Sequence, residues 1–372
     1  MLFKGTRKRT TRQIKEQIEG LGGQLNAYTG EESTCYFAKV MKQNFESTFD
    51  VLADMINHAT LKSRELEKER TVILEEIKMY QDLPSQFVQE KINTLLWPDQ
   101  PLGRPIAGTK KTVSGMSRKD LLDYKNRHYH PSEILVAVSG ELSPFWVEKL
   151  AAQSFNGSKK KVANYQKAST RQRKPQVAIW ERKTEQTHFV VGLHAVSKNH
   201  SDRYLMGLLN VILGANMSSR LFEEVREKRG LAYEIRSQYC GYQDTGIFQI
   251  TAGVETGKTI QAIRVILKEL EKIASAPVKA KELERAKEYY WSRLQMTAED
   301  TLDHMLWAGE YYLYRDHPPA WQEIQEKIWE ATPEDVRRVA ESMIKNNRLN
   351  LAAIGPLKEP VKNRIQKEFV LR

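Results

Sequence analysis

The sequence predicts an α+β fold made of two repeated domains, each a mostly antiparallel sheet covered by helices. Strand-like runs are grouped with helical runs instead of alternating strictly with them, which is typical of α+β domains. The length of 372 residues is long for one hydrophobic core. In addition, a stretch of the first half recurs in the second half at a constant spacing. We therefore expect two domains of like fold.

The repeat joins a helix start to a following strand. Residues 116–122 open a helix that leads to a predicted strand at 134–140. Residues 331–336 lead in the same way to a predicted strand at 349–355. Asp120 and Asp335 lie 215 positions apart, as do Gly140 and Gly355, so this piece repeats without a gap.

The boundaries of the two domains follow from composition. We expect a first domain at 1–156, a basic linker at 157–175 and a second domain at 176–372. The linker is polar, ends at Pro175 and contains seven of the basic residues that give the chain its net charge of +11. These are Lys159, Lys160, Lys161, Lys167, Arg171, Arg173 and Lys174. No nucleic-acid-binding motif surrounds them, so we expect a solvated linker and no nucleic-acid partner.

Further elements follow from residue periodicity. In the first half, strand-like residues 24–40 are followed by an amphipathic helix at 44–57. In the second half, a strand at 189–193 is followed by an amphipathic helix at 258–273.

A glutamate-rich helix at 64–77 carries the first candidate site. Glu69 and Glu76 are seven residues apart, which is two helical turns, so both carboxylates share one face. The apolar residues of the packing stripe beside them are Leu66, Ile73 and Ile77. Taken alone, a helix of this kind more often presents an ordinary solvated charged face. At an offset of 217 residues, its repeat places Arg293 where the first half has Glu76.

Three segments in a fixed order give this helix a family context. The segments 1–6 (Met-Leu-Phe-Lys-Gly-Thr), 21–29 and 69–76 together resemble the pitrilysin/insulinase family of zinc metallopeptidases. The resemblance is closest to the bacterial processing-protease branch, which is similar to mitochondrial processing peptidase, and it covers essentially the whole chain.

The resemblance implies a zinc site that includes Glu76. In the family, an inverted His-x-x-Glu-His motif stands directly before the segment that matches residues 1–6, and a glutamate about 76 residues further on completes the ligand set. Two histidines, this glutamate and an open position for water form a catalytic zinc site. We therefore expect the chain to begin one residue after its own motif, with one or two leading strands missing. Either the given sequence starts at an internal methionine, downstream of the native start, or the chain is a non-catalytic remnant. In both cases residues 1–372 are expected to be inactive alone.

The second half carries a matching signature at 218–233. It resembles the arginine/tyrosine motif of the family, which implies that Arg226 and Tyr233 reach the substrate and donate hydrogen bonds to the carbonyl oxygen as it gains charge. Without the family, Arg226 would be interpreted as a surface charge and Tyr233 as an aromatic residue at a strand entry. Glu69 joins them as a candidate catalytic carboxylate.

Substrate binding and assembly are also implied by the resemblance. Asn26 and Ala27 are expected on an edge strand, where an extended peptide can add itself as one more strand. The alternative is an ordinary hairpin entry after Gly22-Gly23. The family forms half of a clamshell chamber from one chain, so we expect a zinc endopeptidase acting as a homodimer. The alternatives are a chamber-forming subunit without activity and a basic scaffold protein.

The remaining residues point to no other site. His128 and His130 lie in a predicted turn without a third ligand nearby, so they do not predict a substitute zinc site. Cys35 and Cys240 are too few for a disulfide framework or a thiolate cluster. No apolar run approaches the roughly eighteen residues of a membrane span, and we expect a cytoplasmic protein.

Overall fold

The structure, a computed structural model, describes residues 1–157, 165–315 and 317–371. It contains helices together with sheets of two and five strands, which confirms the predicted α+β class. Its residues form two compact units that interleave along the chain. Unit 1 comprises Met1–Lys78, Ile106–Tyr165 and Met296–Pro318, and unit 2 comprises Met79–Pro105, Gln166–Gln295 and Pro319–Arg372.

These units are groups of residues in mutual contact, and the domain boundaries at 156 and 176 stay a prediction. Lys159, Lys160 and Lys161 of the expected linker lie outside the described residues. None of the helices in the described ranges is long and apolar enough to cross a membrane.

Unit 2 is built on a five-stranded sheet with the strand order β3-β7-β4-β6-β5. The strands are β3 (Gln176–Glu181), β4 (Thr187–Ala195), β5 (Ala232–Gly241), β6 (Gly246–Val254) and β7 (Asn350–Gly355). The β3–β7 pair is parallel, and the other three pairs are antiparallel. The predicted strand at 189–193 is thus the middle of β4, whose side chains are almost all buried.

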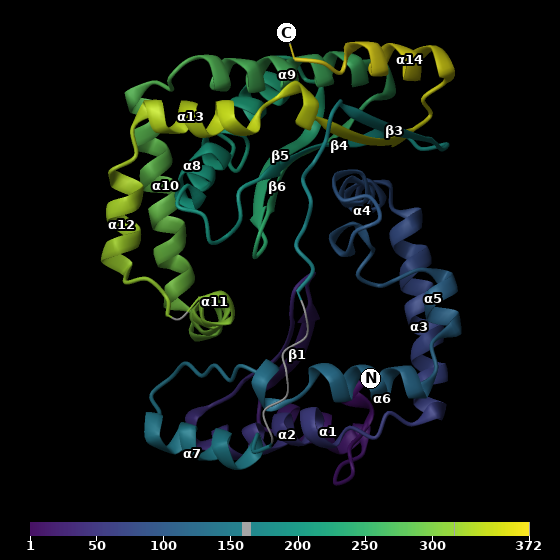
Figure 1. Ribbon diagram of the computed structural model, residues 1–372, viewed down its shortest axis with the longest axis vertical. Helices are drawn as coiled ribbons and strands as arrows, with labels where there is room; N and C mark the ends of the chain where they lie inside the picture. Colours follow the sequence, from purple (N-terminus) through teal and green to yellow (C-terminus); the bar gives the residue numbers. More distant parts are fainter. Residues whose placement is uncertain (158–164, 316, 372) are drawn as a thin grey trace. The chain divides into compact units, whose positions relative to one another are not determined.

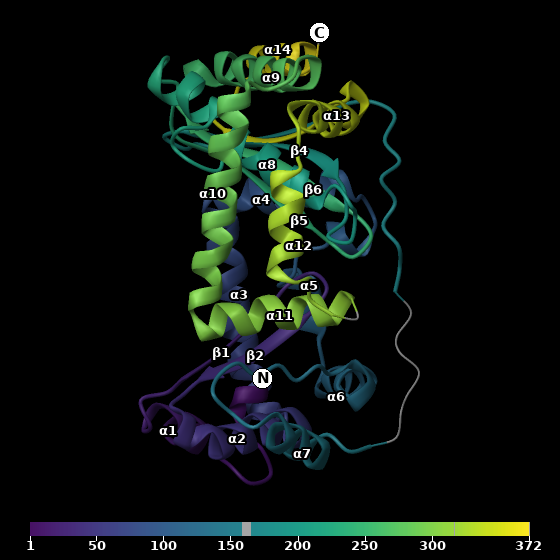
Figure 2. The ribbon, with the colours of Figure 1, turned by 90° about the vertical axis from the view of Figure 1, so that its left-hand side faces the viewer.

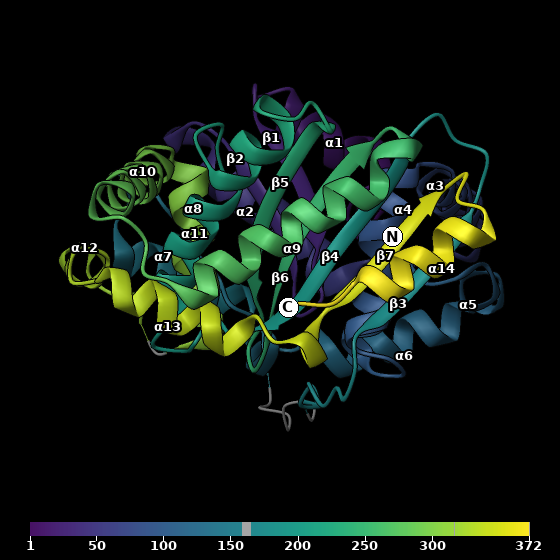
Figure 3. The same cartoon turned by 90° about the horizontal axis from the view of Figure 1, so that it is seen from above.

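Helices cover both faces of this sheet. Figure 1 shows α9 (Thr259–Ser275) and α14 (Glu359–Glu368) on one face and α4 (Pro84–Leu96) on the other. Seen from above in Figure 3, α9 runs over the central strands. Unit 2 also contains α8 (Arg203–Leu213), most of α10 (Ala280–Glu299), α12 (Trp321–Trp329) and α13 (Pro333–Met343).

Unit 1 is centred on an antiparallel hairpin of β1 (Gln24–Thr29) and β2 (Thr34–Lys39). The helices α1 (Thr11–Glu19), α2 (Phe45–His58) and α7 (Pro144–Ser154) gather on one side of this hairpin (Figure 2). Apolar side chains of α1 and α2 form a small core with Leu25 of β1. The unit also contains most of α3 (Ser63–Asp82), α5 (Lys110–Gly115), α6 (Arg118–His128) and α11 (Thr301–Tyr314).

The internal repeat is visible in the elements. Helices α6 and α13 have 11 residues each, and a capping box opens each of them, at Ser117 and at Thr332. Helices α3 and α10 have 20 residues each. The capping serine or threonine accepts a hydrogen bond from the backbone N–H of the aspartate three residues later, and the side chain of that aspartate accepts one from the backbone N–H of the cap residue. The same local signals therefore start the same helix twice.

The predicted strand at 134–140 is not part of a sheet. These residues form neither a helix nor a strand and pair in no ladder with the other described residues, whereas their counterpart β7 lies between β3 and β4. The sequence correctly indicates an apolar segment after α6. The prediction of a strand at 134–140 was wrong, because a strand exists only where a neighbouring backbone supplies hydrogen-bond partners.

One pair of repeated helices is exchanged between the units. Helix α4 follows α3 in the sequence, yet it packs under the sheet of unit 2, with Val88, Ile92 and Leu96 in one core with Val190. Its repeat counterpart α11 belongs to unit 1, where Gly309 lies against Ala137. Each repeat thus provides a covering helix for the other unit.

Candidate functional site

The two glutamates of α3 differ in their surroundings. Leu66 and Ile77 of α3 are buried, and the helix turns Glu69 toward the N-terminal segment, where Lys4 Nζ lies 2.6 Å from Glu69 Oε1. The Glu69 side chain is 21% exposed. Glu76 is exposed, and no hydrogen bond or ion pair joins its side chain to another described residue. Glu69 is therefore engaged in an ion pair, while Glu76 presents an unpaired carboxylate.

The amino group of Met1 lies close to Glu69. Burial lowers the pKa of this amino group, and the negative charge of Glu69 opposes that effect. A positive group, the Lys4 ammonium, also pairs with the same carboxylate. The start of the described chain and Glu69 are thus brought together in unit 1.

A buried carboxylate fixes this N-terminal segment to α2. Asp54 is 2% exposed and accepts hydrogen bonds from Thr6 Oγ1 at 2.6 Å and from Arg9 Nη1 at 2.8 Å. His58 Nδ1 lies 3.1 Å from its other oxygen. The burial of Asp54 alone would raise its pKa, but the hydrogen bonds from Thr6 and Arg9 outweigh this effect and hold the pKa below its usual value. Residues 1–9 are therefore positioned by an ionised side chain.

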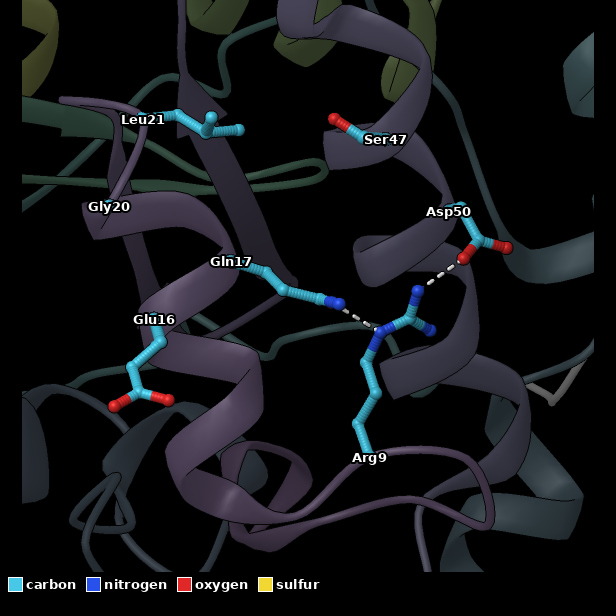
Figure 4. Close-up of a pocket in the computed structure, with 7 residues that line it drawn as sticks. All are labelled: Arg9, Glu16, Gln17, Gly20, Leu21, Ser47 and Asp50. Atoms are coloured by element: carbon cyan, nitrogen blue, oxygen red, sulfur yellow. Dashed lines mark hydrogen bonds and ion pairs between the residues drawn. The ribbon is translucent and has the colours of Figure 1, made fainter.

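Arg9 also bridges two helices at the surface. Its guanidinium lies between Gln17 of α1 and Asp50 of α2 (Figure 4), and its Nε donates to Gln17 Oε1 at 2.6 Å. The surface pocket around it is lined by Glu16 and Ser47 among others. The Arg9 side chain contacts both helices and so holds α1 against α2.

Asn26 and Ala27 lie on an open edge of the hairpin. In the described residues, β1 pairs with β2 along one side only, with Asn26 opposite Phe37 and Ala27 opposite Tyr36. The Ala27 N–H points away from β2 and donates to Asn26 Oδ1 at 2.8 Å. Amide groups at this edge are available to an incoming strand.

Arg226 and Tyr233 are brought together in unit 2. Arg226 lies in a π-helical turn, Phe222–Glu227, and its guanidinium is 5.0 Å from the centre of the Tyr233 ring and 4.7 Å from that of Phe222. Tyr233 occupies the irregularity between Ala232 and Glu234 of β5 and is 80% exposed. A π-turn and a bulge both re-aim side chains and are frequent at functional sites. The pair therefore presents a guanidinium and a hydroxyl to solvent.

The described residues do not fit a catalytic zinc ion by themselves. They contain no group of three or more His, Cys, Asp or Glu side chains arranged to hold a metal. A catalytic zinc ion needs three protein ligands and an open position, whereas Glu76 is a single exposed carboxylate. His130 is buried, and neither of its ring nitrogens has a hydrogen-bond partner in the part of the chain described. We therefore derive no zinc chemistry from these residues.

Sequence reasoning missed two features of unit 1. One is the Asp54 cluster, whose only signal was an aspartate among the apolar positions of an amphipathic helix. The other is an apolar groove beside β2, lined also by α2, residues 134–142 and the start of α11. Neither has a sequence motif, because both depend on residues that meet only in the folded unit.

Comparison with known sequences supports the family context. The family model described as insulinase (peptidase family M16) matches residues 1–110, and the model of the peptidase M16 inactive domain matches residues 115–290. An uncharacterized zinc protease of Streptomyces coelicolor is 33% identical over 372 residues, which cover 98% of this chain and 81% of that protein. An uncharacterized zinc protease of Bacillus subtilis is also 33% identical and covers 96% of this chain and 86% of its own length.

Comparison with solved structures supports the fold. A protease from Helicobacter pylori superposes with a TM-score of 0.88 at 21% identity, covering 95% of this chain and 87% of the other. A peptidase M16 inactive domain from Pseudomonas fluorescens gives a TM-score of 0.86 at 19% identity, covering 96% and 86%. With sequence matches along nearly the whole chain and this shared fold, the chain belongs to the insulinase (M16) family of peptidases.

Proposed function

We propose that this chain is the peptide-holding part of a zinc-dependent endopeptidase that cuts extended or unfolded peptides. Residues 1–372 supply the surfaces that bind and orient the peptide, together with one carboxylate for a metal site, Glu76. The family membership and the zinc-protease names of the relatives support the reaction class.

The open edge of β1 carries this proposal. In an antiparallel strand, the N–H groups of alternate residues point to the same edge, so the amides of Leu25 and Thr29 share the outward direction of Ala27. The Asn26 side-chain oxygen accepts the hydrogen bond of the Ala27 N–H when no peptide is present. An extended peptide can replace it with its own carbonyl oxygen and continue the pairing along β1, with little dependence on sequence.

We propose that Arg226 and Tyr233 of a second copy of this chain supply donors to the bound peptide. A guanidinium and a phenol can both donate hydrogen bonds to a peptide carbonyl oxygen, and such donors stabilise that oxygen as it becomes negative. The Arg226 guanidinium lies over the Tyr233 ring, 5.0 Å from the ring centre, so both donors belong to one cluster of side chains. We assign Glu69 a positioning role, because its carboxylate is already paired with Lys4.

The assembly and location are part of the same proposal. We place the protein in the cytoplasm as a homodimer in which each chain supplies half of a closed peptide chamber, because closed two-fold assembly is the commonest form of a homo-oligomer. The two cysteines, which are not joined in a disulfide, fit a reducing compartment.

A second candidate function is that of a chamber-forming subunit without its own activity. The match of residues 115–290 to the model of the peptidase M16 inactive domain is the observation that favours it. The reading frame upstream of the Met1 codon discriminates between the two functions. An in-frame His-x-x-Glu-His motif ending directly before that codon would support the endopeptidase, whereas a stop codon there would support the inactive subunit.

Substitution of Ala27 tests the peptide-binding edge. We expect Ala27→Pro to weaken the binding of a fluorescein-labelled unfolded casein peptide to the 372-residue chain by about tenfold, as the outward N–H is lost. The ladder with β2 stays intact, because the Ala27 N–H does not take part in it. Fluorescence anisotropy gives the affinity. The matched control, Ala27→Val, keeps the N–H and should bind normally. Equal binding by both variants would show that the peptide is held elsewhere.

Metal content provides a separate test of the donor set. After dialysis, the purified chain is expected to retain far less than one zinc ion per polypeptide, because one exposed carboxylate cannot compete with water and buffer for the ion. Atomic absorption measures the ratio. Zinc retained at one ion per chain, and lost in Glu76→Gln, would mean that residues 1–372 complete a site by themselves.

A further inference from the structure

The π-turn Phe222–Glu227 of unit 2 has a firmly held backbone. The side chains of Leu221, directly before the turn, and of Val225, within it, are fully buried. The backbone N–H of Lys228 donates to the carbonyl oxygen of Glu223 at 2.9 Å, which is the hydrogen bond of a π-turn. The other side chains of the turn therefore project from a backbone that buried residues hold in place.

The connection from this turn to β5 is held as well. The N–H of Gly230 donates to the carbonyl oxygen of Arg226, and the N–H of Leu231 donates to that of Val225, both at 2.9 Å. Gly230 has a φ of +55°, in the left-handed region that favours glycine. Since the backbone on both sides of Arg226 is held, the freedom that remains at this residue is that of its long side chain.

Hydrogen bonds do not hold the Arg226 guanidinium. The two basic side chains that follow it are both occupied by Glu224, with Lys228 Nζ at 2.7 Å and Arg229 Nη1 at 2.6 Å from its carboxylate. Arg226 Nε lies 3.7 Å from Glu227 Oε1, which is too long for a hydrogen bond. The guanidinium thus keeps its N–H donors available, and something other than an acceptor must determine where it lies.

Two aromatic rings hold it instead. The centre of the guanidinium lies over the Phe222 ring at 4.7 Å and over the Tyr233 ring at 5.0 Å from the ring centres. Both distances are within the roughly 6 Å over which a ring face attracts a cation. Phe222 is half-buried and belongs to the anchored turn, whereas Tyr233 is 80% exposed. Phe222 is therefore the better-held of the two rings.

We infer that Phe222 is a positioning residue for the donor pair. Its ring holds the Arg226 guanidinium, and the guanidinium in turn supports the exposed Tyr233 ring, so that both groups are in place to donate to a peptide carbonyl oxygen. Phe222 acts through Arg226 and does not itself bind the peptide. This inference deepens the proposed function and rests on the donor role that it gives to Arg226 and Tyr233.

The type of contact explains why an aromatic residue is needed at position 222. A ring face attracts the charge of the guanidinium without using any of its N–H groups as a conventional hydrogen bond would, so the donors stay available. A donor that is held in place before binding also loses less conformational freedom when the peptide arrives. Leucine would keep much of the apolar volume of Phe222 but would offer no ring face to the cation.

Nuclear magnetic resonance tests the support directly. The signal is the Nε–H resonance of Arg226 in the intact 372-residue chain labelled with ¹⁵N-arginine, assigned by its absence in Arg226→Lys. A nucleus above a ring face is shielded, so we expect an upfield resonance that moves toward the position of a free arginine in Phe222→Leu. Phe222→Tyr keeps the ring and should keep the resonance in place. An unchanged resonance in Phe222→Leu would overturn the inference.

A matched control shows that the change is specific. Phe145 of α7 is also a phenylalanine, and it is 76% exposed. Phe145→Leu makes the same chemical change in unit 1 and should leave the Arg226 resonance where it is. An equal displacement of the resonance by Phe145→Leu would mean that the signal does not report on the Phe222 ring, which would also overturn the inference.

Peptide affinity tests the consequence. We expect Phe222→Leu to weaken the binding of the fluorescein-labelled unfolded casein peptide by about three- to fivefold, which is the size of one exposed cation–π contact. Phe222→Tyr should bind as the original chain does, and circular dichroism checks that both variants are folded. Arg226→Ala should weaken binding by about tenfold, since a charged donor is lost.

The double variant shows whether Phe222 acts through Arg226. If it does, Phe222→Leu combined with Arg226→Ala should bind no more weakly than Arg226→Ala alone. Losses that simply add would overturn the inference, because Phe222 would then act independently of Arg226.

Failure of the inference can be told apart from failure of the proposed function. Full affinity in both Arg226→Ala and Tyr233→Phe would refute the donor role on which the inference rests. Weakened binding in these two variants, together with full affinity in Phe222→Leu, would overturn the positioning role of Phe222 alone.

Discussion

Replacement of Trp97 by alanine is expected to lower the free energy of unfolding by about 4 kcal/mol. Trp97 caps the C-terminus of α4 and is fully buried, with its ring centre 5.5 Å from that of His194 and 5.6 Å from that of Tyr242. Its removal leaves a cavity between α4 and the sheet of unit 2, where the packed strands cannot collapse to fill it. Urea unfolding followed by circular dichroism measures the change.

The control for this prediction is Trp97→Phe. Phenylalanine keeps an aromatic ring against His194, and it removes an indole N–H that has no hydrogen-bond partner among the described residues. We expect it to cost less than half as much as alanine. Equal losses for the two variants would indicate that the size of the ring, rather than its presence, determines the packing of α4. A negligible loss in Trp97→Ala would contradict the packing of α4 on this sheet.

Replacement of Asp54 by alanine is expected to cost about 3 kcal/mol, at the lower end of the range for breaking a buried ion pair. The substitution leaves Thr6 without its partner and removes one of the carboxylates that pair with Arg9. The cost stays at the lower end because Arg9 keeps Asp50 and Gln17. Since Asp54 anchors residues 1–9, the Lys4–Glu69 pair should also loosen, and limited proteolysis should cut this segment faster. The control, Asp50→Ala, removes an exposed partner of Arg9 and should cost less than about 1 kcal/mol.

The same carboxylate predicts a pH dependence. Its pKa in the folded protein lies below the ordinary value of 3.8, so its stabilising contribution is fully present above that value and is lost as the pH falls through the lowered pKa. Below about pH 4, the stability of the original protein should therefore approach that of Asp54→Ala. A stability difference between the two proteins that stays constant down to pH 2 would contradict this role. Thermal unfolding at a series of pH values measures it.

Features with local causes could be predicted from the sequence. The helix at 64–77 lies within α3, and the capping signals at Ser117 and Thr332 mark the starts of α6 and α13. The repeat spacing likewise predicted which elements of the two halves correspond. Each of these signals is carried by neighbouring residues in the chain.

Features that depend on distant partners could not be predicted. Residues 134–140 have the composition of a strand, but pairing depends on a backbone that the sequence does not indicate. The packing of α4 against β4 joins residues about a hundred positions apart. At the candidate site, the residue types of Glu69 and Glu76 gave no sign that Lys4 would occupy one carboxylate and leave the other open. The contact between Arg226 and Tyr233 depends on a π-turn and a bulge, and no residue pattern predicted either of them.

The exchange of α4 and α11 bears on how a duplicated gene can evolve. After a simple duplication, each copy can be lost, shuffled or transferred as an independent module. Here a fragment that ended after the first repeat would carry α4 without the sheet that buries it, and it would lack the helix that lies against Ala137. A fragment with only the second repeat would carry α11 without the unit 1 residues that it packs against, and it would lack α4 beneath its sheet. Each repeat therefore depends on the other for the partner of one of its helices, and neither repeat alone would bury all of its apolar surface.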